Sequence, residues 1–194
     1  AMSTAISRIP FETPRSGASP SFIDALHCDG PAADRADRMG LYGWLIGAWD
    51  MDVHVLPADG ARIEGKGEIH FGWVLEGRAI QDVWITPPRG FRDDPAAAHA
   101  DFYGSTFRIY DPGLDAWHIF WLDPAKQLYS RMLGCAAGKD IEQLTVNETP
   151  QRRWRFSEIT PSSFHWTADV DDGAPGGAPK WRRHVEFFAR RIAG

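Results

Sequence analysis

The sequence has little that would assign it to a nucleic-acid-binding or membrane class. Lys and Arg number 21 against 26 Asp and Glu, which gives a net charge of −5. Because no basic run or stripe is present, a nucleic acid is not an expected partner. Hydrophobic runs are too short to span a bilayer, and no segment has the layout of a signal peptide. We therefore expect a cytoplasmic protein with no membrane partner.

Cysteine and the common catalytic motifs are also scarce. Cys28 and Cys135 are the two cysteines, and neither belongs to a C-x-x-C or Cys/His spacing. We therefore expect no metal site and two free thiols, with one disulfide left open. The sequence contains no P-loop, no G-x-G-x-x-G after a strand, no G-x-S-x-G and no H-E-x-x-H. These absences argue against nucleotide-dependent and nucleophilic hydrolytic chemistry, and no cofactor is expected from motifs.

Aromatic residues, by contrast, are abundant. The chain has nine Trp, eleven Phe and four Tyr among 194 residues. Large rings fill wide protein interiors or line pockets for apolar ligands. The composition thus favours a protein with a broad apolar interior.

The domain organisation is simple. Residues 1–18 are polar and are predicted to be a disordered tail. One domain is predicted over residues 19–194, with short helices within 19–40 and a barrel over 41–192. In the first helix, Ser19 would be the N-cap and Pro20 would lie in the first turn, and the helix would end near Gly30.

The second helix is predicted over residues 31–39, ending at Gly40. From there the sequence alternates apolar and polar residues in short segments separated by turn residues. Ten strands are predicted, at residues 48–56, 62–74, 79–86, 102–110, 116–122, 127–134, 140–147, 152–159, 163–170 and 181–191. Consecutive strands with short links predict an all-β fold, a single up-and-down antiparallel barrel, which has no exposed edges. Whether the longer connection at 87–101 closes over the barrel is left open.

The start of the first barrel strand carries a family resemblance. Gly47-Ala48-Trp49 is a G-x-W sequence just after a short helical turn. It resembles the calycin superfamily and, within it, bacterial lipocalin-like proteins of unknown function. The resemblance covers residues 41–192 and implies that the Trp closes the barrel base under a basic residue of the last strand, Arg190 or Arg191. It also implies that the barrel holds a small apolar molecule.

A second similarity is to nitrobindins, the haem-binding calycins. The opening at 45–49 is similar to theirs, and 184–191 is similar to their last strand, which supplies a His to the haem iron. The resemblance implies His184 as the haem ligand. The glycine-rich pattern that nitrobindins carry after the Trp is absent, however, because Asp50-Met51-Asp52 stands there. Strand alternation also directs His184 outward unless a β-bulge intervenes.

Turn positions predict which residues share a face. A two-residue loop at Glu76-Gly77 places Phe71 opposite Asp82 on the apolar, inward face. Counting across later hairpins places Arg108 opposite Trp117. The predicted ligand-binding residues are Phe71, Trp73, Trp84, Phe102, Tyr110, Trp117, Trp121 and Met132.

Other positions follow from the same alternation. His118 is predicted to face outward, and so are Glu158 and His165, which are expected to lie opposite each other. On the last strand, Trp181 and Val185 are predicted to face inward.

Asp82 is the most informative single residue, since it would be a carboxylate among rings. Burial raises the pKa of a carboxylate, which suits a general base near neutral pH. Arg108, on the next strand, would pair with Asp82 or bind a ligand carboxylate. The alternative is a structural Asp82 that is satisfied by an Arg.

The sequence therefore predicts a protein that binds a small hydrophobic or aromatic molecule inside the barrel. One alternative is a cofactor-free isomerase, cyclase or lyase with Asp82 and Arg108 as catalytic residues. Another is a haem protein with His184 as the ligand. A homodimer is left open.

Overall fold

The computed structural model describes residues 21–95 and 101–193. The predicted tail at 1–18 and part of the 87–101 connection lie outside these residues. The first described elements are α1 (Phe22–Leu26), β1 (His27–Cys28), η1 (Ala33–Arg35) and α2 (Ala36–Gly43), and η2 (Arg89–Phe91) follows β4. The barrel strands are β2 (Gly47–Val55), β3 (Ile63–Val74), β4 (Ala79–Thr86), β5 (Phe102–Asp111), β6 (Ala116–Asp123), β7 (Leu128–Ala137), β8 (Asp140–Thr145), β9 (Arg152–Ser157), β10 (Ser163–Asp171) and β11 (Trp181–Arg191).

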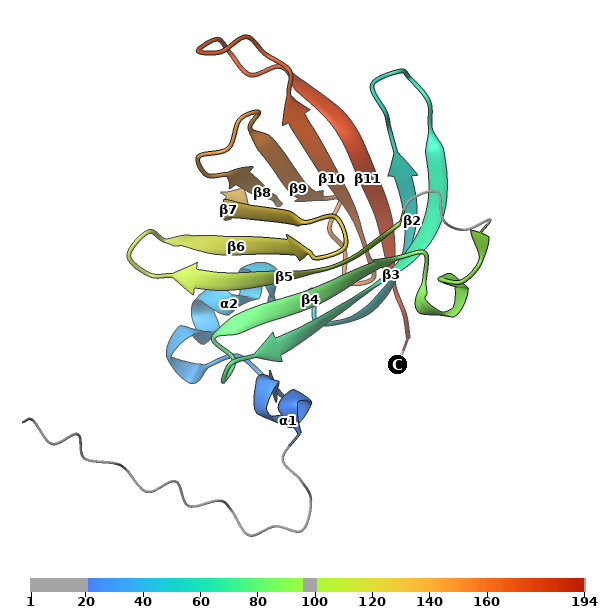
Figure 1. The fold of residues 1–194 in the computed structure, drawn as a ribbon. Helices are drawn as coiled ribbons and strands as arrows, with labels where there is room; N and C mark the ends of the chain where they lie inside the picture. The colour runs from blue at the N-terminus through green and yellow to red at the C-terminus, as the bar shows by residue number, and fades with distance from the viewer. Residues whose placement is uncertain (1–20, 96–100, 194) are drawn as a thin grey trace, which may run out of the picture.

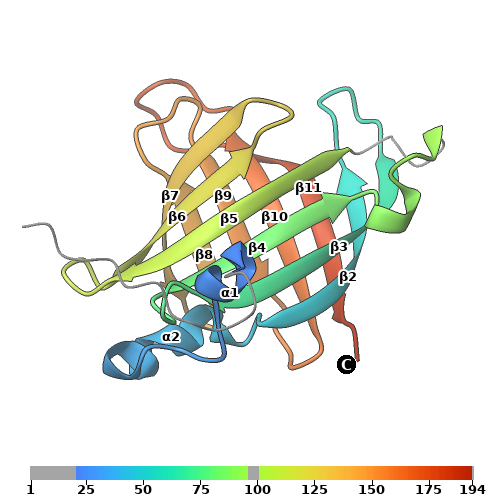
Figure 2. The ribbon, with the colours of Figure 1, turned by 60° about the horizontal axis from the view of Figure 1, so that its bottom comes forward.

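The strands form a closed antiparallel barrel (Figures 1 and 2). Each strand from β2 to β10 pairs with the strand that follows it along the chain, and β11 pairs back with β2, which closes the barrel. The predicted all-β up-and-down barrel is thus confirmed. The short strand β1 adds to the end of β3. None of the helices that the structure describes has the length and apolar character needed to cross a bilayer.

The first helix differs from its prediction. Its N-cap is Ser21, whose Oγ accepts a hydrogen bond from the N–H of Ile23 at 3.2 Å. The helix ends at Leu26 and does not extend to Gly30, because residues 27–28 leave it to pair with β3. Tertiary pairing with the sheet therefore overrides the local helix signal here.

The second helix, α2, lies under one end of the barrel and closes it (Figure 2). It begins later than predicted and continues past Gly40 to Gly43. Its buried residues explain the extension. Tyr42 is fully buried and makes edge-to-face contacts with Trp117 at 4.9 Å and Phe156 at 6.1 Å between ring centroids. We call this end of the barrel the base.

The G-x-W tryptophan lies at the base, as the resemblance implied. Trp49 is fully buried and donates its indole N–H to the carbonyl of Leu45 at 2.7 Å. The basic residue is Arg191, whose guanidinium carbon lies 4.1 Å from the centroid of a Trp49 ring. The same guanidinium donates to the carbonyls of Trp44, at 2.5 Å, and Ile46, at 2.7 Å. Arg191 thus joins the last strand to the chain that enters the first.

From β3 to β6 the strand registers keep the predicted inward faces. Between β3 and β4, Phe71 pairs with Asp82 as expected. Between β5 and β6 the register is two residues from the prediction, because Trp117 pairs with Tyr110 and Arg108 with Ile119. A shift of two residues leaves every side chain on the same face of the sheet.

The predicted register of the β9–β10 hairpin is wrong by one residue. His165 pairs with Ser157 and not with Glu158, which has a positive φ of 52° and belongs to the turn. Both His165 and Glu158 nevertheless lie outside the barrel, since the inward face of β10 holds Phe164 and Trp166.

The Arg191 contacts predict a specific effect on stability. Replacing Arg191 by Ala removes the stacking on Trp49 and three charge-assisted hydrogen bonds, the third to the carbonyl of Pro161 at 2.9 Å, so the free energy of unfolding should fall by about 2–3 kcal/mol. Arg190→Ala is the matched control, because Arg190 is exposed and its surface ion pair with Asp52 should contribute at most about 1 kcal/mol. Urea unfolding followed by circular dichroism measures both, and equal losses would contradict the assigned role.

Candidate functional site

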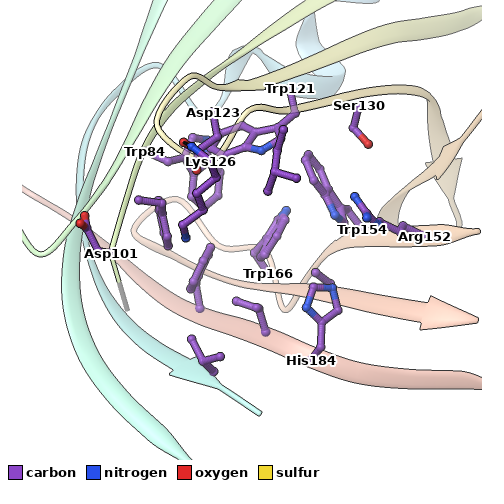
Figure 3. A pocket seen from close by; sticks show the side chains of 16 residues that line it. Trp84, Asp101, Trp121, Asp123, Lys126, Ser130, Arg152, Trp154, Trp166 and His184 are labelled. Carbon is purple, nitrogen blue, oxygen red and sulfur yellow. Dashed lines mark hydrogen bonds between the residues drawn. The ribbon is translucent and has the colours of Figure 1, made fainter. Parts of the chain in front are cut away.

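The barrel contains a cavity of about 360 Å³ at the end away from α2 (Figure 3). Aromatic rings from six strands form much of its wall. These rings are Trp84 of β4, Phe102 of β5, Trp121 of β6, Trp154 of β9, Trp166 of β10 and Phe187 of β11. Val55, Leu128, Ala168 and Val185 add aliphatic surface.

The rings touch one another in a continuous series. Phe187 stacks on Trp166 with centroids 4.7 Å apart and an interplanar angle of 9°. Trp154 lies 5.3 Å from Trp166, and Trp121 lies 6.0 Å from Trp154. On the other side Phe102 lies 5.8 Å from Phe187. Each ring therefore holds its neighbour, which gives the cavity a pre-formed apolar wall.

Three of the eight predicted ligand-binding residues line this cavity: Trp84, Phe102 and Trp121. The other five are Phe71, Trp73, Tyr110, Trp117 and Met132, and none of them is among the lining residues. They lie nearer the base, within or against the core cluster of buried side chains. Met132 and Trp117, for example, are almost completely buried in the core cluster. The five residues outside the cavity therefore share the inward faces with its lining, and their role in binding a ligand stays a prediction.

Sequence reasoning missed Trp154 as a cavity residue. The signal was available, since Arg152, Trp154 and Phe156 alternate with Arg153 and Arg155 along β9. The alternation identifies one face of the strand. The structure places Trp154 of that face in the cavity and Phe156 in the core.

Asp82 and Arg108 come together inside the barrel. Their side chains are 0% and 1% exposed and form an ion pair through Arg108 Nη1 and Asp82 Oδ2. The second carboxylate oxygen, Oδ1, accepts a hydrogen bond from the N–H of Thr106 at 2.7 Å. Neither Asp82 nor Arg108 is among the residues that line the cavity. This arrangement matches the structural alternative for Asp82, and the general-base role stays a prediction.

Aromatic rings surround the Arg108 guanidinium. Its central carbon lies 5.4 Å from the Tyr42 ring centroid, 5.6 Å from that of Phe71 and 5.7 Å from that of Phe156. These rings come from α2, β3 and β9. The Arg108 guanidinium therefore contacts both the helix at the base and two different strands of the barrel wall.

His184 lines the cavity, although strand alternation directed it outward. The reason is a β-bulge. Val185 pairs with Ala168, whereas Arg183 pairs with Asp169, which leaves His184 as the extra residue. Beyond the bulge the faces are exchanged, so Trp181 lies against Arg153 on the outer surface and its predicted inward position is wrong.

The His184 ring is more than half buried, and this burial lowers its pKa from the ordinary value. The positive charges of Arg152 and Arg182 lower that pKa further, whereas Asp169 raises it. No hydrogen bond of the imidazole is found within residues 21–95 and 101–193. The neutral imidazole is therefore favoured.

The remaining polar lining residues are Asp101, Asp123, Lys126, Ser130 and Arg152. Asp101 pairs with Arg92 at 2.8 Å. Asp123 accepts the backbone N–H of Lys126 at 3.2 Å. In the part of the chain that the structure describes, no group of three or more His, Cys, Asp or Glu residues is arranged to hold a metal ion. Cys28 and Cys135 are both free.

The buried ion pair predicts the result of removing one charge. Asp82→Asn leaves the Arg108 guanidinium buried without a counter-charge, so the free energy of unfolding should fall by about 3–5 kcal/mol. The double variant Asp82→Leu, Arg108→Met removes both charges and should recover most of that loss. Chemical denaturation of the two variants measures the difference. An Asp82→Asn protein with the same free energy of unfolding as the parent would show that the ion pair does not stabilise the barrel interior.

Comparisons with known proteins agree with the barrel fold. No protein-family model matches the chain, and neither does any curated protein. Among solved structures, Rv2717c from M. tuberculosis aligns with a TM-score of 0.50 at 13% identity, over 81% of this chain and 99% of that one. The S-type phycobiliprotein lyase CPES from Guillardia theta aligns with a TM-score of 0.51 at 10% identity, over 84% and 99%. At these identities the likeness shows the fold alone, and that fold is a lipocalin- or calycin-like barrel.

Proposed function

We propose that this protein binds a small apolar, aromatic molecule in the cavity at the open end of the barrel. The observation that carries the proposal is the continuous wall of six rings around a space of about 360 Å³. Small-molecule pockets are usually clefts of about 300–1,000 Å³ with apolar and aromatic walls and a few polar groups. The cavity has this size and this composition.

An enzymatic role is the alternative, because the barrel shared with the phycobiliprotein lyase is compatible with binding or with lyase-type action. We favour binding for a structural reason. The isomerase, cyclase or lyase alternative requires Asp82 as its general base. Asp82, however, is not among the residues that line the cavity, and it is already paired with Arg108. The aromatic rings of the cavity support binding of an apolar molecule, but they do not by themselves assign a reaction to the protein.

Binding of a neutral aromatic probe tests the proposal. Isothermal titration calorimetry with naphthaleneethanol should show one site per chain. Trp154→Ala removes one ring of the wall and should weaken binding by about 1 kcal/mol or more. We choose Trp154 because it is only partly buried, so that its removal disturbs the core less than the loss of Trp166 would.

Trp181→Ala is the matched control for that experiment. Trp181 is also a partly buried tryptophan, but it lies on the outer surface against Arg153 and does not line the cavity. The affinity of the Trp181→Ala variant for naphthaleneethanol should equal that of the parent protein. Absence of binding to the parent protein, or equal weakening in both variants, would count against the cavity as the site.

Haem binding is a second candidate because the bulge places His184 in the cavity. Its neutral imidazole has no hydrogen bond within the described residues, and a neutral imidazole is the form that binds iron. His184 would hold the iron, and the ring wall would contact the macrocycle. When bound, haem would supply redox chemistry at its iron.

An absorption titration with haemin distinguishes this candidate. If His184 binds the iron, a sharp Soret band should appear with the parent protein and disappear with His184→Ala. His165→Ala is the control, since His165 lies outside the barrel against Glu186. A band of equal strength in all three proteins, or no band at all, would remove haem as a ligand held by His184.

A further inference from the structure

We propose that the ligand of this cavity is an amphipathic anion, with an aromatic body held by the ring wall and a carboxylate bound by Arg152. This inference rests on the proposed function and deepens it by naming the chemical class of the ligand. It comes from the charges around the cavity and from which of them already have partners.

Arg152 is the arginine of its strand without a carboxylate partner. Its neighbours on β9 both point outward and are paired: Arg153 with Asp169 at 2.8 Å and Arg155 with Asp140 at 3.0 Å. The Arg152 side chain instead lines the cavity, and within the described residues its guanidinium makes no hydrogen bond or ion pair. It is partly buried, so it is only partly solvated by bulk water. A partly buried guanidinium without a partner is stabilised by a charge-assisted hydrogen bond to an anionic ligand.

The acidic groups of the cavity do not neutralise Arg152. Asp101 is paired with Arg92, which lies outside the lining. Asp123 is buried in the turn that carries Lys126 and accepts its backbone N–H. The Lys126 ammonium nitrogen itself lies 5.8 Å from the centroid of the Phe102 ring, so a second cation faces the same space. With Asp101 neutralised by Arg92, the lining is left with two cations, Arg152 and Lys126, against one carboxylate, Asp123.

The position of His184 supports the same polarity. Burial lowers the pKa of this imidazole first, and the charges of Arg152 and Arg182 lower it in addition, against the opposing effect of Asp169. Burial disfavours any charge at this place, but the Arg152 charge that acts on the imidazole would also stabilise a carboxylate bound beside it. Figure 3 shows Arg152 and His184 on the same side of the cavity, beyond Trp154 and Trp166.

This geometry separates the two parts of the ligand. The rings of Trp154 and Trp166 are in contact at 5.3 Å and offer flat apolar surface to an aromatic body. Arg152 precedes Trp154 by two residues on the same face of β9, one step farther from the base. A guanidinium presents paired N–H donors that match the two oxygens of a carboxylate. A ligand that spans both places has the ring inside and the acid at the Arg152 end.

Three probes with one ring system and different charges test the inference. They are naphthaleneacetate, naphthaleneethanol and naphthylethylamine, each titrated calorimetrically into the intact protein. Naphthaleneacetate should bind about tenfold tighter than the neutral alcohol or better, and the amine should bind more weakly than the alcohol. In Arg152→Gln the preference for the acid should disappear, while the affinity for the alcohol should stay within about twofold of the parent.

Arg182→Gln is the control variant. Arg182 lies near His184 but pairs with Asp172 and does not line the cavity, so this variant should keep the preference for the acid. Equal affinities for acid and alcohol, or an acid preference that survives in Arg152→Gln, would overturn the inference and leave the proposed function standing. Failure of all three probes to bind the parent protein would overturn both.

Discussion

The buried ion pair between Asp82 and Arg108 is the interaction on which the rest of the interior depends. Two charges without water inside a barrel are stable only when they neutralise each other. Here the backbone N–H of Thr106 binds the second oxygen of Asp82, and three rings surround the Arg108 guanidinium, whose Nε has no hydrogen-bond partner among the described residues. Because the Arg108 guanidinium contacts rings from α2 and from opposite walls, the lower half of the barrel is filled.

The consequence is a barrel of two halves. Below the ion pair, Trp49, Tyr42 and Arg191 close the base by ring packing and hydrogen bonds to carbonyls. Above it, the inward side chains are large rings at the barrel wall, and they leave a cavity between them. The same alternation of inward residues therefore produces packing at one end and recognition at the other.

The sequence allowed the faces to be predicted, but not the depth. The Glu76-Gly77 turn gave the β3–β4 register, and the two-residue error between β5 and β6 left the faces unchanged. Strand alternation has a period of two, so it carries no information about which inward residue reaches the cavity and which the core. Trp117 and Trp121 have the same parity, and only Trp121 lines the cavity.

The bulge was the other feature beyond sequence reasoning. An extra residue between paired positions has no reliable signature in the sequence, and it exchanges the faces of everything beyond it. On β11 it moved His184 into the cavity and Trp181 to the outside. His184 was for this reason absent from the predicted inward face, although the G-x-W motif and Arg191 marked the base correctly.

The most direct test of this account is an NMR titration of the indole N–H resonances, of which the nine tryptophans supply one each, with naphthaleneacetate. The account predicts that the resonances of the cavity tryptophans, Trp84, Trp121, Trp154 and Trp166, shift during the titration. Those of Trp49 and Trp117, which are buried in the base, should stay in place. Shifts at Trp49 and Trp117 with none at the cavity tryptophans would contradict the division of the barrel into a packed base and a binding half.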